Sequence, residues 1–207
     1  MPKTDRRIER TKSTLIATFQ KLVLERGYSK VKVKDIVDEA NYNRTTFYVH
    51  YDGKEQLAKE MIELEMERFC YEFCKPVRDN PILDLTKMNP NETDVFQYMK
   101  DNSHYYDLLV IQDPIPGIRE ALLEVLKDMF QNRFSFIGDK ASEINADYFT
   151  HYRAYGIYGW ILEWIRSSYD ATPSEMARRI INLLHYHSSL MKEVNNRNNL
   201  LIKQDNK

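Results

Sequence analysis

A short polar stretch near the N-terminus carries side chains whose chemistry suits recognition of DNA. It contains Arg44, Thr45, Thr46 and Tyr48. The guanidinium of Arg44 can donate two hydrogen bonds to one guanine edge, and a Thr methyl group can contact the methyl group of thymine. Either Thr can instead bond a phosphate, and Tyr48 can instead pack as a core aromatic. The stretch predicts a DNA-reading surface if one element presents these side chains together.

Two short helices joined by a tight turn would position them. Small and apolar residues at helical spacing mark the first helix and comprise Val33, Ile36, Val37 and Ala40. Asn41 can take the left-handed backbone of a sharp exit turn, and Asn43 is a good N-cap for the next helix. That helix spans residues 44–51, with Phe47 and Tyr51 spaced to face inward. This pattern predicts a helix-turn-helix, in which the start of the second helix reaches base edges.

These residues resemble the DNA-binding domain of TetR-family transcriptional regulators over roughly residues 6–66. The matching features are Asp35-Ile36, Ala40, the three-residue turn, Arg44, Thr46-Phe47-Tyr48, His50 and Lys54-Glu55-x-Leu57. Three features depart from the family pattern. The turn reads Asn41-Tyr42-Asn43 where the family usually has Gly-Val-Ser, Tyr51 replaces a Phe, and Lys32 replaces a Thr.

The resemblance implies DNA contacts for further residues. In the family, the Tyr, His and Lys that match Tyr48, His50 and Lys54 commonly contact the DNA backbone, and Lys34 matches a frequently basic position. Together with the helix start, the predicted DNA-binding residues are Lys34, Asn43, Arg44, Thr45, Thr46, Tyr48, His50 and Lys54. Lys30 and Lys32 can also neutralise phosphates or can simply be solvated.

Composition and charge agree with a regulator that binds DNA through one end. Hydrophobic residues make up 43% and charged residues 29% of the 207 residues, as in ordinary globular proteins. Residues 1–60 hold 13 Lys/Arg and 9 Asp/Glu, whereas residues 61–207 hold 17 and 22. A basic N-terminal third fits an electrostatic footprint on DNA, although chance variation in surface charge is an alternative.

No arrangement of residues predicts catalysis or a metal site. The chain lacks a glycine-rich phosphate loop, a Gly-x-Ser-x-Gly elbow and a His-Glu-x-x-His motif. Cys70 and Cys74 would share a helix face, but no neighbouring ligand completes a zinc site, so we expect small hydrophobic side chains there. We therefore predict no enzymatic activity, no cofactor and no metal.

The rest of the chain is predicted to be helical between a few breakers. Asp52 and Glu55 resemble a capping box that opens a helix to about Cys74, with Leu57, Met61, Leu64 and Phe69 inward. Residues 76–91 are rich in Pro and Asn and predict an irregular connection with a turn of helix at 82–85. The remaining predicted helices span residues 5–26, 92–100, 103–111, 118 to near Gly138, 146–168 and 173–195.

The last two predicted helices are the expected dimer interface. Gly156 and Gly159 interrupt the first of them, which favours close approach of another helix or a ligand. Its sequence resembles the C-terminal domain of a TetR subgroup that includes regulators of dihydroxyacetone kinase. Thr172 and Glu175 form a second predicted capping box. Packing within one subunit is the alternative for these apolar stripes. The predicted effector-binding residues are Tyr105, Tyr152, Tyr155 and Trp160.

The sequence therefore predicts an all-α fold of about nine helices in two domains. Residues 1–52 would form a three-helix DNA-binding domain and residues 53–207 a helical effector-binding and dimerisation domain. We expect a cytoplasmic, sequence-specific transcriptional regulator, by the family's habit a repressor. Its partners would be double-stranded operator DNA, a second copy of the chain and a small-molecule effector, with no membrane. An all-α enzyme and a dimeric scaffold with a degenerate helix-turn-helix are the alternatives.

Overall fold

Nine α-helices dominate the part of the chain that the structure, a computed structural model, describes: residues 3–80, 82–137, 146–187 and 190–193. They are α1 (Lys3–Arg26), α2 (Val33–Glu39), α3 (Arg44–His50), α4 (Lys54–Asp79), α5 (Asp94–Asp101), α6 (Ser103–Tyr106), α7 (Ile118–Asp128), α8 (Ala146–Arg166) and α9 (Pro173–His187). The all-α prediction is confirmed apart from one small sheet. The predicted polar tail after Asn195 and the position of Gly138 lie outside the described residues.

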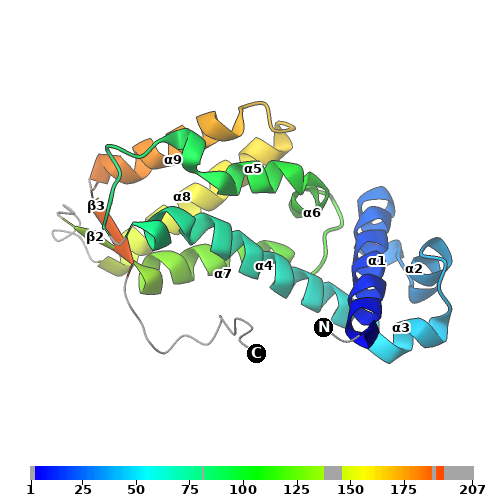
Figure 1. Cartoon of the computed structure of the whole chain (residues 1–207). Coiled ribbons are helices and arrows are strands. Elements are labelled where there is room, and N and C mark those ends of the chain that lie inside the picture. Colours follow the sequence, from blue (N-terminus) through cyan, green and yellow to red (C-terminus); the bar gives the residue numbers. More distant parts are fainter. Residues whose placement is uncertain (1–2, 81, 138–145, 188–189, 194–207) are drawn as a thin grey trace.

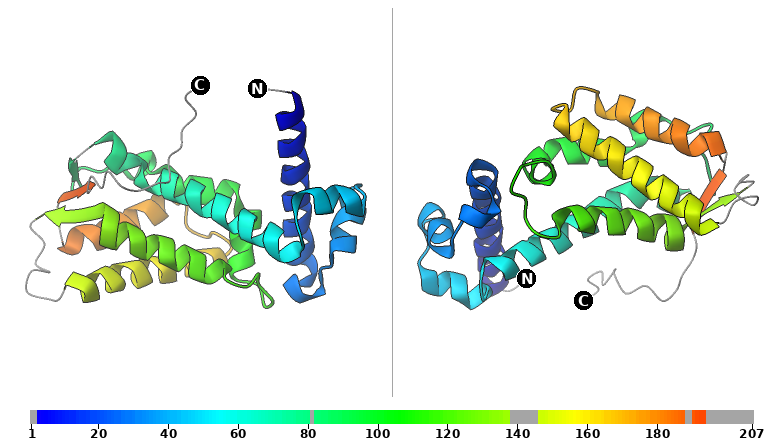
Figure 2. Two further views of the ribbon diagram at one scale, coloured as in Figure 1. Left: turned by 90° about the horizontal axis from the view of Figure 1, so that it is seen from below. Right: turned by 180° about the vertical axis from the view of Figure 1, so that it is seen from behind.

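The helices form two groups that α4 connects. Figure 1 shows α1, α2 and α3 together at one end of the molecule, and α5 to α9 around the far part of α4. Figure 2 shows the same arrangement from two further sides. We call α1 to α3 the N-terminal bundle and α4 to α9 the C-terminal bundle. Within the described residues, no helix is both long and apolar enough to span a bilayer.

The N-terminal bundle forms because its turn residues and its apolar residues agree. Asn41 has φ of 56°, so it supplies the left-handed turn after α2 as predicted. The helix-turn-helix packs α2 and α3 against α1 through fully buried side chains, among them Phe19, Ile36, Phe47 and Tyr51. Burial of these large side chains supplies the stability that the Thr- and Tyr-rich sequence of α3 lacks.

The start of α4 differs from the prediction. Gly53, not Asp52, is the N-cap, and it makes no side-chain capping bond. The backbone N–H of Asp52 donates to Gln56 Oε1 at 2.5 Å, while the carboxylate of Glu55 accepts from the hydroxyl of Tyr28 at 3.4 Å. The predicted capping box is therefore wrong, because Glu55 lies toward a residue on another element.

The far end of α4 also extends beyond its predicted end at Cys74. The helix continues through Pro76 to Asp79, although proline inside a helix removes one backbone hydrogen bond. Val77 is buried in this last turn, and this packing offsets the loss. Leu64, predicted to face inward, is exposed, whereas the neighbouring Glu65 is buried.

A three-stranded antiparallel sheet replaces the helix predicted in three places. Its strand order is β1-β3-β2, with β1 at Ile82–Asp84, β2 at Phe134–Ile137 and β3 at Leu190–Glu193. Leu83 and Phe136 both pair with Met191, which is buried in the central strand. Sequence periodicity missed these strands because apolar runs of three or four residues fit a helix and a strand equally well.

Short irregular helices join the main elements. They are the 3₁₀ helices η1 (Tyr28–Lys30), η2 (Pro90–Glu92) and η3 (Asp107–Leu109), and the π-helical turn η4 (Met129–Arg133). Because η4 and β2 follow α7 directly, the apolar stripe from Ile118 does not form one helix to its predicted end. At α9, the backbone N–H of Glu175 donates to Thr172 Oγ1 and that of Thr172 donates to Glu175 Oε2, so this capping box is confirmed.

A set of hydrogen bonds around Asp113 connects the segment before α7 to the N-terminal bundle. Asp113 lies in the segment before α7, and its carboxylate accepts from the Ser29 backbone N–H at 2.8 Å and from the Ser29 hydroxyl at 2.6 Å. Its carbonyl accepts from the N–H of Tyr28 at 3.0 Å. The Ser29 hydrogen bonds hold the pKa of Asp113 below its ordinary value. We call this set of bonds the Asp113 contact.

Gly27 has two reasons to be glycine, and substitution separates them. Its φ is +82°, and an added Cβ would lie 2.6 Å from the carboxylate of Asp113. Gly117 has the same φ but open space around it. We expect Gly117→Ala to lower the free energy of unfolding by about 1 kcal/mol through backbone strain, and Gly27→Ala to lower it clearly more. Chemical denaturation of both variants tests this. Equal losses would show that the Asp113 side chain adjusts without cost.

Candidate nucleic-acid interface and ligand region

The start of α3 is held by a hydrogen-bonded cap. Asn43 Oδ1 accepts from the backbone N–H of Thr46 at 2.7 Å and from the Thr46 hydroxyl at 2.8 Å. Asn43 is therefore the N-cap that the sequence predicted. Because the Thr46 hydroxyl bonds Asn43, these two residues stabilise the helix start next to the exposed Arg44 and Thr45.

The outward face of α3 follows from the burial of its inward face. Phe47 is fully buried, so Arg44, Thr45 and Tyr48 lie on the solvent side. Tyr48 is 55% exposed, and its ring meets the ring of Phe47 edge to face at a centroid distance of 5.6 Å. The alternative that Tyr48 is a core aromatic is therefore wrong. His50 is half-buried, with its ring against that of Tyr51.

Exposed cations lie around this face. Lys34 and Lys32 are exposed at the start of α2, and Arg6, Arg7 and Arg10 are exposed along the first turns of α1. Two further cations of the bundle are engaged in ion pairs: Lys12 with Glu60 at 2.9 Å and Lys21 with Glu39 at 2.5 Å. Arg26 and Lys30 are exposed as well, so the excess positive charge seen in the sequence is not confined to the first group.

Lys54 has a structural role beside its predicted one. Its Nζ donates to the carbonyl oxygens of Tyr28 at 2.8 Å and Val31 at 2.9 Å, and it lies 4.1 Å from the centroid of the Tyr28 ring. These contacts fasten the first turn of α4 to the end of η1. The predicted phosphate contact would use the third ammonium proton, so it stays a prediction.

The four predicted effector residues do not surround one cavity. Tyr105 is fully buried in α6, while Tyr152, Tyr155 and Trp160 are about half exposed along one side of α8. They therefore belong to two different places, a buried polar cluster and an exposed aromatic face.

The buried polar cluster was not predicted from the sequence beyond Tyr105. Glu65 of α4 is only 7% exposed, and it accepts a hydrogen bond from the hydroxyl of Tyr98 in α5 at 2.7 Å. Tyr105 and Tyr106 of α6 are fully buried beside it. Among the described residues, the Tyr105 hydroxyl has no hydrogen-bond partner, whereas the Tyr106 hydroxyl lies close enough to Glu65 to lower the pKa of that carboxyl. One signal could have revealed the cluster: Glu65 follows Met61 by four residues, inside the apolar stripe of α4.

Burial dominates the electrostatics of this cluster. It raises the pKa of Glu65 above the ordinary glutamate value, although the Tyr98 and Tyr106 hydroxyls and the nearby charges of Arg68 and His104 lower it in part. Burial, followed by the negative charge of Glu65, raises the pKa of Tyr106 well above its ordinary value. Buried hydroxyls beside a buried carboxylate form a polar site that a ligand could complete.

The exposed aromatic face lies on α8 and consists of Tyr148, Tyr152, Tyr155 and Trp160. Gly159 lies on the same side, and an added Cβ there would meet nothing within 4 Å. Gly156 instead lies near α9, with an added Cβ 3.9 Å from Leu183. A Cβ at 3.9 Å would make an ordinary van der Waals contact, so the proximity of α9 does not require glycine at position 156, and the space beside Gly159 is open to another surface.

The two cysteines lie on one helix face, as predicted. Their sulfur atoms are 3.9 Å apart, and Arg133 Nη1 donates to Cys70 Sγ at 3.0 Å. Among the described residues, no three His, Cys, Asp or Glu side chains are placed to hold a metal ion.

Sequence comparison connects the chain with known regulators. Residues 15–61 match the family of bacterial regulatory proteins called the tetR family, and residues 88–186 match a transcriptional regulator C-terminal region, TetR_C_8. The chain is 28% identical over 190 residues to an uncharacterized HTH-type transcriptional regulator, YxbF, of Bacillus subtilis (strain 168). That match covers 87% of this chain and 46% of the relative, so the chain spans about half of the relative's length.

Solved structures share the fold. A TetR transcriptional regulator from Streptococcus agalactiae 2603V has a TM-score of 0.59 at 22% identity, over 87% of this chain and 97% of that chain. The dihydroxyacetone kinase operon activator DhaS has a TM-score of 0.56 at 19% identity, over 86% of this chain and 98% of that chain. The fatty acid degradation regulator FadR from Bacillus halodurans has a TM-score of 0.61 at 13% identity, over 84% and 94%.

The charge of Glu65 should make stability depend on pH. Because its pKa is raised in the folded chain, the free-energy cost of its charge is absent below the ordinary glutamate pKa and appears as pH rises through the raised value. Glu65→Gln removes that charge and keeps an acceptor for Tyr98. We expect this variant to exceed the wild type in free energy of unfolding at about pH 8, with the difference shrinking toward about pH 4.

Urea denaturation across this pH range measures the difference. Glu67→Gln, at an exposed position of the same helix, is the control and should leave the pH dependence unchanged. A constant difference between Glu65→Gln and wild type at every pH would contradict the assignment of the effect to Glu65 ionisation.

Proposed function

The chain belongs to the TetR family of transcriptional regulators, and from this premise we propose that it is a homodimeric repressor that a small-molecule effector releases from its operator. The observation that carries the proposal is the outward face of α3. Its first turn is capped by Asn43 and presents Arg44 and Thr45 to solvent. In a helix-turn-helix, this is the part of the second helix that reaches base edges in the major groove.

The remaining predicted DNA-binding residues would fix the register of α3 in the groove. Exposed Tyr48 and Lys34 flank the reading residues and are suited to phosphate oxygens. His50 and Lys54 lie at the end of α3 and the start of α4, so any contact from them would come from the edge of the footprint. In this proposal, residues 1–52 form the DNA-binding domain and residues 53–207 the second domain.

Dimerisation would place two copies of α3 on one face of DNA. One short helix covers only a few base pairs, whereas two helices about 34–36 Å apart fit successive major grooves. The exposed aromatic face of α8 supports a helix-to-helix interface, since aromatic side chains are enriched at such surfaces. The open space beside Gly159 would let a partner helix approach closely.

The buried polar cluster is our proposed effector site, in place of the full set of aromatics predicted from the sequence. Among the described residues, the Tyr105 hydroxyl is buried without a hydrogen-bond partner, so it is a group that a ligand could satisfy beside Tyr106 and Glu65. The cluster joins α4, α5 and α6, and α6 packs against α1 of the N-terminal bundle. An effector that binds one arrangement of these helices more tightly would shift the equilibrium toward that arrangement, by no more than its difference in affinity for the two. The spacing between the two copies of α3 in the dimer would change with it.

Salt-dependent DNA binding tests the function. We expect tight binding to DNA flanking the chain's own gene, with log affinity falling steeply with log salt, and weak binding to a scrambled duplex. Arg44→Ala should weaken operator binding by about 1–3 kcal/mol and reduce the preference over scrambled DNA. A fluorescence anisotropy titration at several salt concentrations measures both effects.

Lys87→Ala is the charge-matched control for Arg44→Ala. The Lys87 side chain is 83% exposed and lies three residues after the end of β1. Figure 1 shows the sheet at the end of the molecule opposite the N-terminal bundle. Lys87→Ala should leave both affinities unchanged. Equal loss on every duplex by Arg44→Ala would instead make Arg44 a phosphate contact. Equally weak binding of wild type to all genomic duplexes would favour the degenerate scaffold.

The dimer surface has its own test. Tyr155→Glu places a charge in the exposed aromatic face and should raise the dimer dissociation constant by at least about tenfold, because removing a charge from water at an interface is costly even with Lys127 near it. Tyr71→Glu is the matched control, since Tyr71 and Tyr155 are equally exposed at 52% and Tyr71 lies on α4. Analytical ultracentrifugation measures both variants. Unchanged dimerisation of Tyr155→Glu would place the interface elsewhere.

A further inference from the structure

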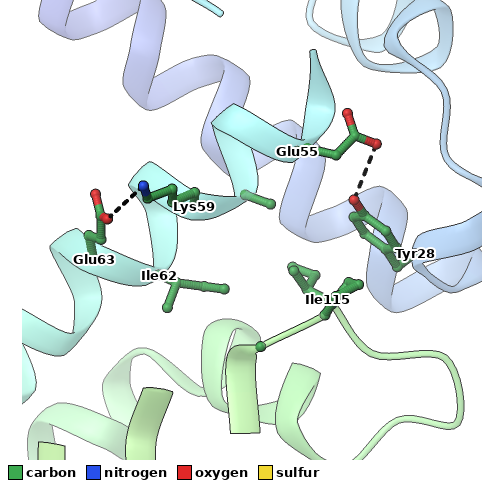
Figure 3. A pocket seen from close by; sticks show the side chains of 9 residues that line it. Tyr28, Glu55, Lys59, Ile62, Glu63 and Ile115 are labelled. Carbon is green, nitrogen blue, oxygen red and sulfur yellow. Dashed lines mark hydrogen bonds and ion pairs between the residues drawn. The ribbon is translucent and has the colours of Figure 1, made fainter. Parts of the chain in front are cut away.

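A groove lies at the junction of the two bundles, separate from the buried polar cluster. Its volume is about 380 Å³, which is within the range of small-molecule sites. It opens between η1, the first turns of α4 and the segment that leads into α7 (Figure 3). Each side of the junction therefore contributes part of its wall.

The interior of the groove is apolar. Ala58 and Ile115 are buried beneath it, and Ile62 is half-buried. Figure 3 shows Ile62 from α4 and Ile115 from the segment before α7 on facing sides, with the ring of Tyr28 near one end. This surface favours an apolar or aromatic body on the ligand, because such a body would leave water on binding.

At the rim, carboxylates outnumber ammonium groups among the residues that line the groove. Glu55 and Glu63 contribute two carboxylates, whereas Lys59 contributes one ammonium group. The Lys54 ammonium, 4.1 Å from the centroid of the Tyr28 ring at one end, is already bonded to two carbonyl oxygens. Neither carboxylate is strongly engaged: Glu55 accepts from the Tyr28 hydroxyl at 3.4 Å, and Glu63 lies 3.8 Å from Lys59 in an exposed ion pair. Exposed pairs of this length contribute little, so both carboxylates remain available to a cation.

We propose that the groove binds a small organic cation with an apolar body, such as a hydrophobic amine. The apolar interior would take the body and one of the two rim carboxylates would take the charge, since eight residues of helix, about 12 Å, separate Glu55 from Glu63. An anion of the same shape would be repelled by the rim, and a neutral molecule would gain only the apolar contact. The occupant is therefore defined by both halves of the site.

Occupancy of the groove would act on the junction itself. The ligand would contact Tyr28 on one side and Ile115 on the other. Tyr28 is part of the Asp113 contact through its backbone N–H, and Ile115 follows Asp113 by two residues. The ligand would thus stabilise one relative position of the bundles, and so change DNA affinity in proportion to its preference for that position. This coupling rests on the proposed function, whereas binding to the groove does not.

Three probes of matched shape test the binding: 4-phenylbutylamine, 4-phenylbutanol and 4-phenylbutyrate. Isothermal titration calorimetry with the full chain should show the amine binding about tenfold more tightly than the alcohol, and the butyrate more weakly than both. Glu55→Gln with Glu63→Gln should abolish the preference for the amine and leave the alcohol unchanged. Gln at position 55 still accepts from Tyr28, so the wall is preserved.

The matched control is Glu67→Gln with Glu120→Gln, which removes the same charge from exposed positions outside the groove. It should retain the preference for the amine. Equal binding of the three probes, no binding at millimolar concentration, or the same loss in both double variants would each overturn the proposed site.

The coupling is tested by measuring the amine affinity with the chain free and with the chain saturated by operator DNA. A difference between the two supports coupling, and identical affinities overturn it. If the chain binds no DNA selectively, the proposed function fails, yet the three-probe comparison still decides the groove.

Discussion

The continuity of α4 is the constraint on which the rest of the structure depends. A helix of 26 residues is about 39 Å long, and α4 runs without a break from the N-terminal bundle to the sheet. Lys54 fastens its first turn to the carbonyls of Tyr28 and Val31, and Glu65 meets the buried tyrosines farther along. A displacement of α4 at the cluster must therefore be taken up either at the Lys54 contacts or by movement of the N-terminal bundle.

The Asp113 contact makes this linkage a closed loop. One route between the bundles runs along α4, a second runs through the segment before α7 to Ser29, and α6 and η3 also pack against α1. The junction groove lies between the two routes (Figure 3). These attachments limit how the two bundles can move relative to one another. The buried cluster and the groove are thus two places where a ligand could bias one motion.

Local chemistry explains which parts of the fold were predictable. Asn41 and Asn43 correctly predicted the turn before α3 and its N-cap, and Thr172 correctly predicted the start of α9. Each of these side chains or backbones acts within a few residues of its own position, so the sequence alone reveals it. Glu55 failed as a capping residue because its carboxylate reaches Tyr28, 27 residues away. The sequence did not predict the strands, because each is too short to show the two-residue alternation of a β-strand. In the sequence, Glu65 stands out only as a charged residue inside the apolar stripe of α4. Its tyrosine partners could be identified only from the tertiary structure.

The pairing of β3 has a consequence for the order in which the chain matures. Residues 190–192 pair with residues 82–84, so the sheet closes over more than a hundred residues of intervening chain. During synthesis from the N-terminus, the helix-turn-helix emerges whole while this partner strand is still absent. Loop closure over such a distance is also slow relative to local helix packing. A nascent chain would hence display its proposed DNA-reading surface well before the C-terminal bundle is complete.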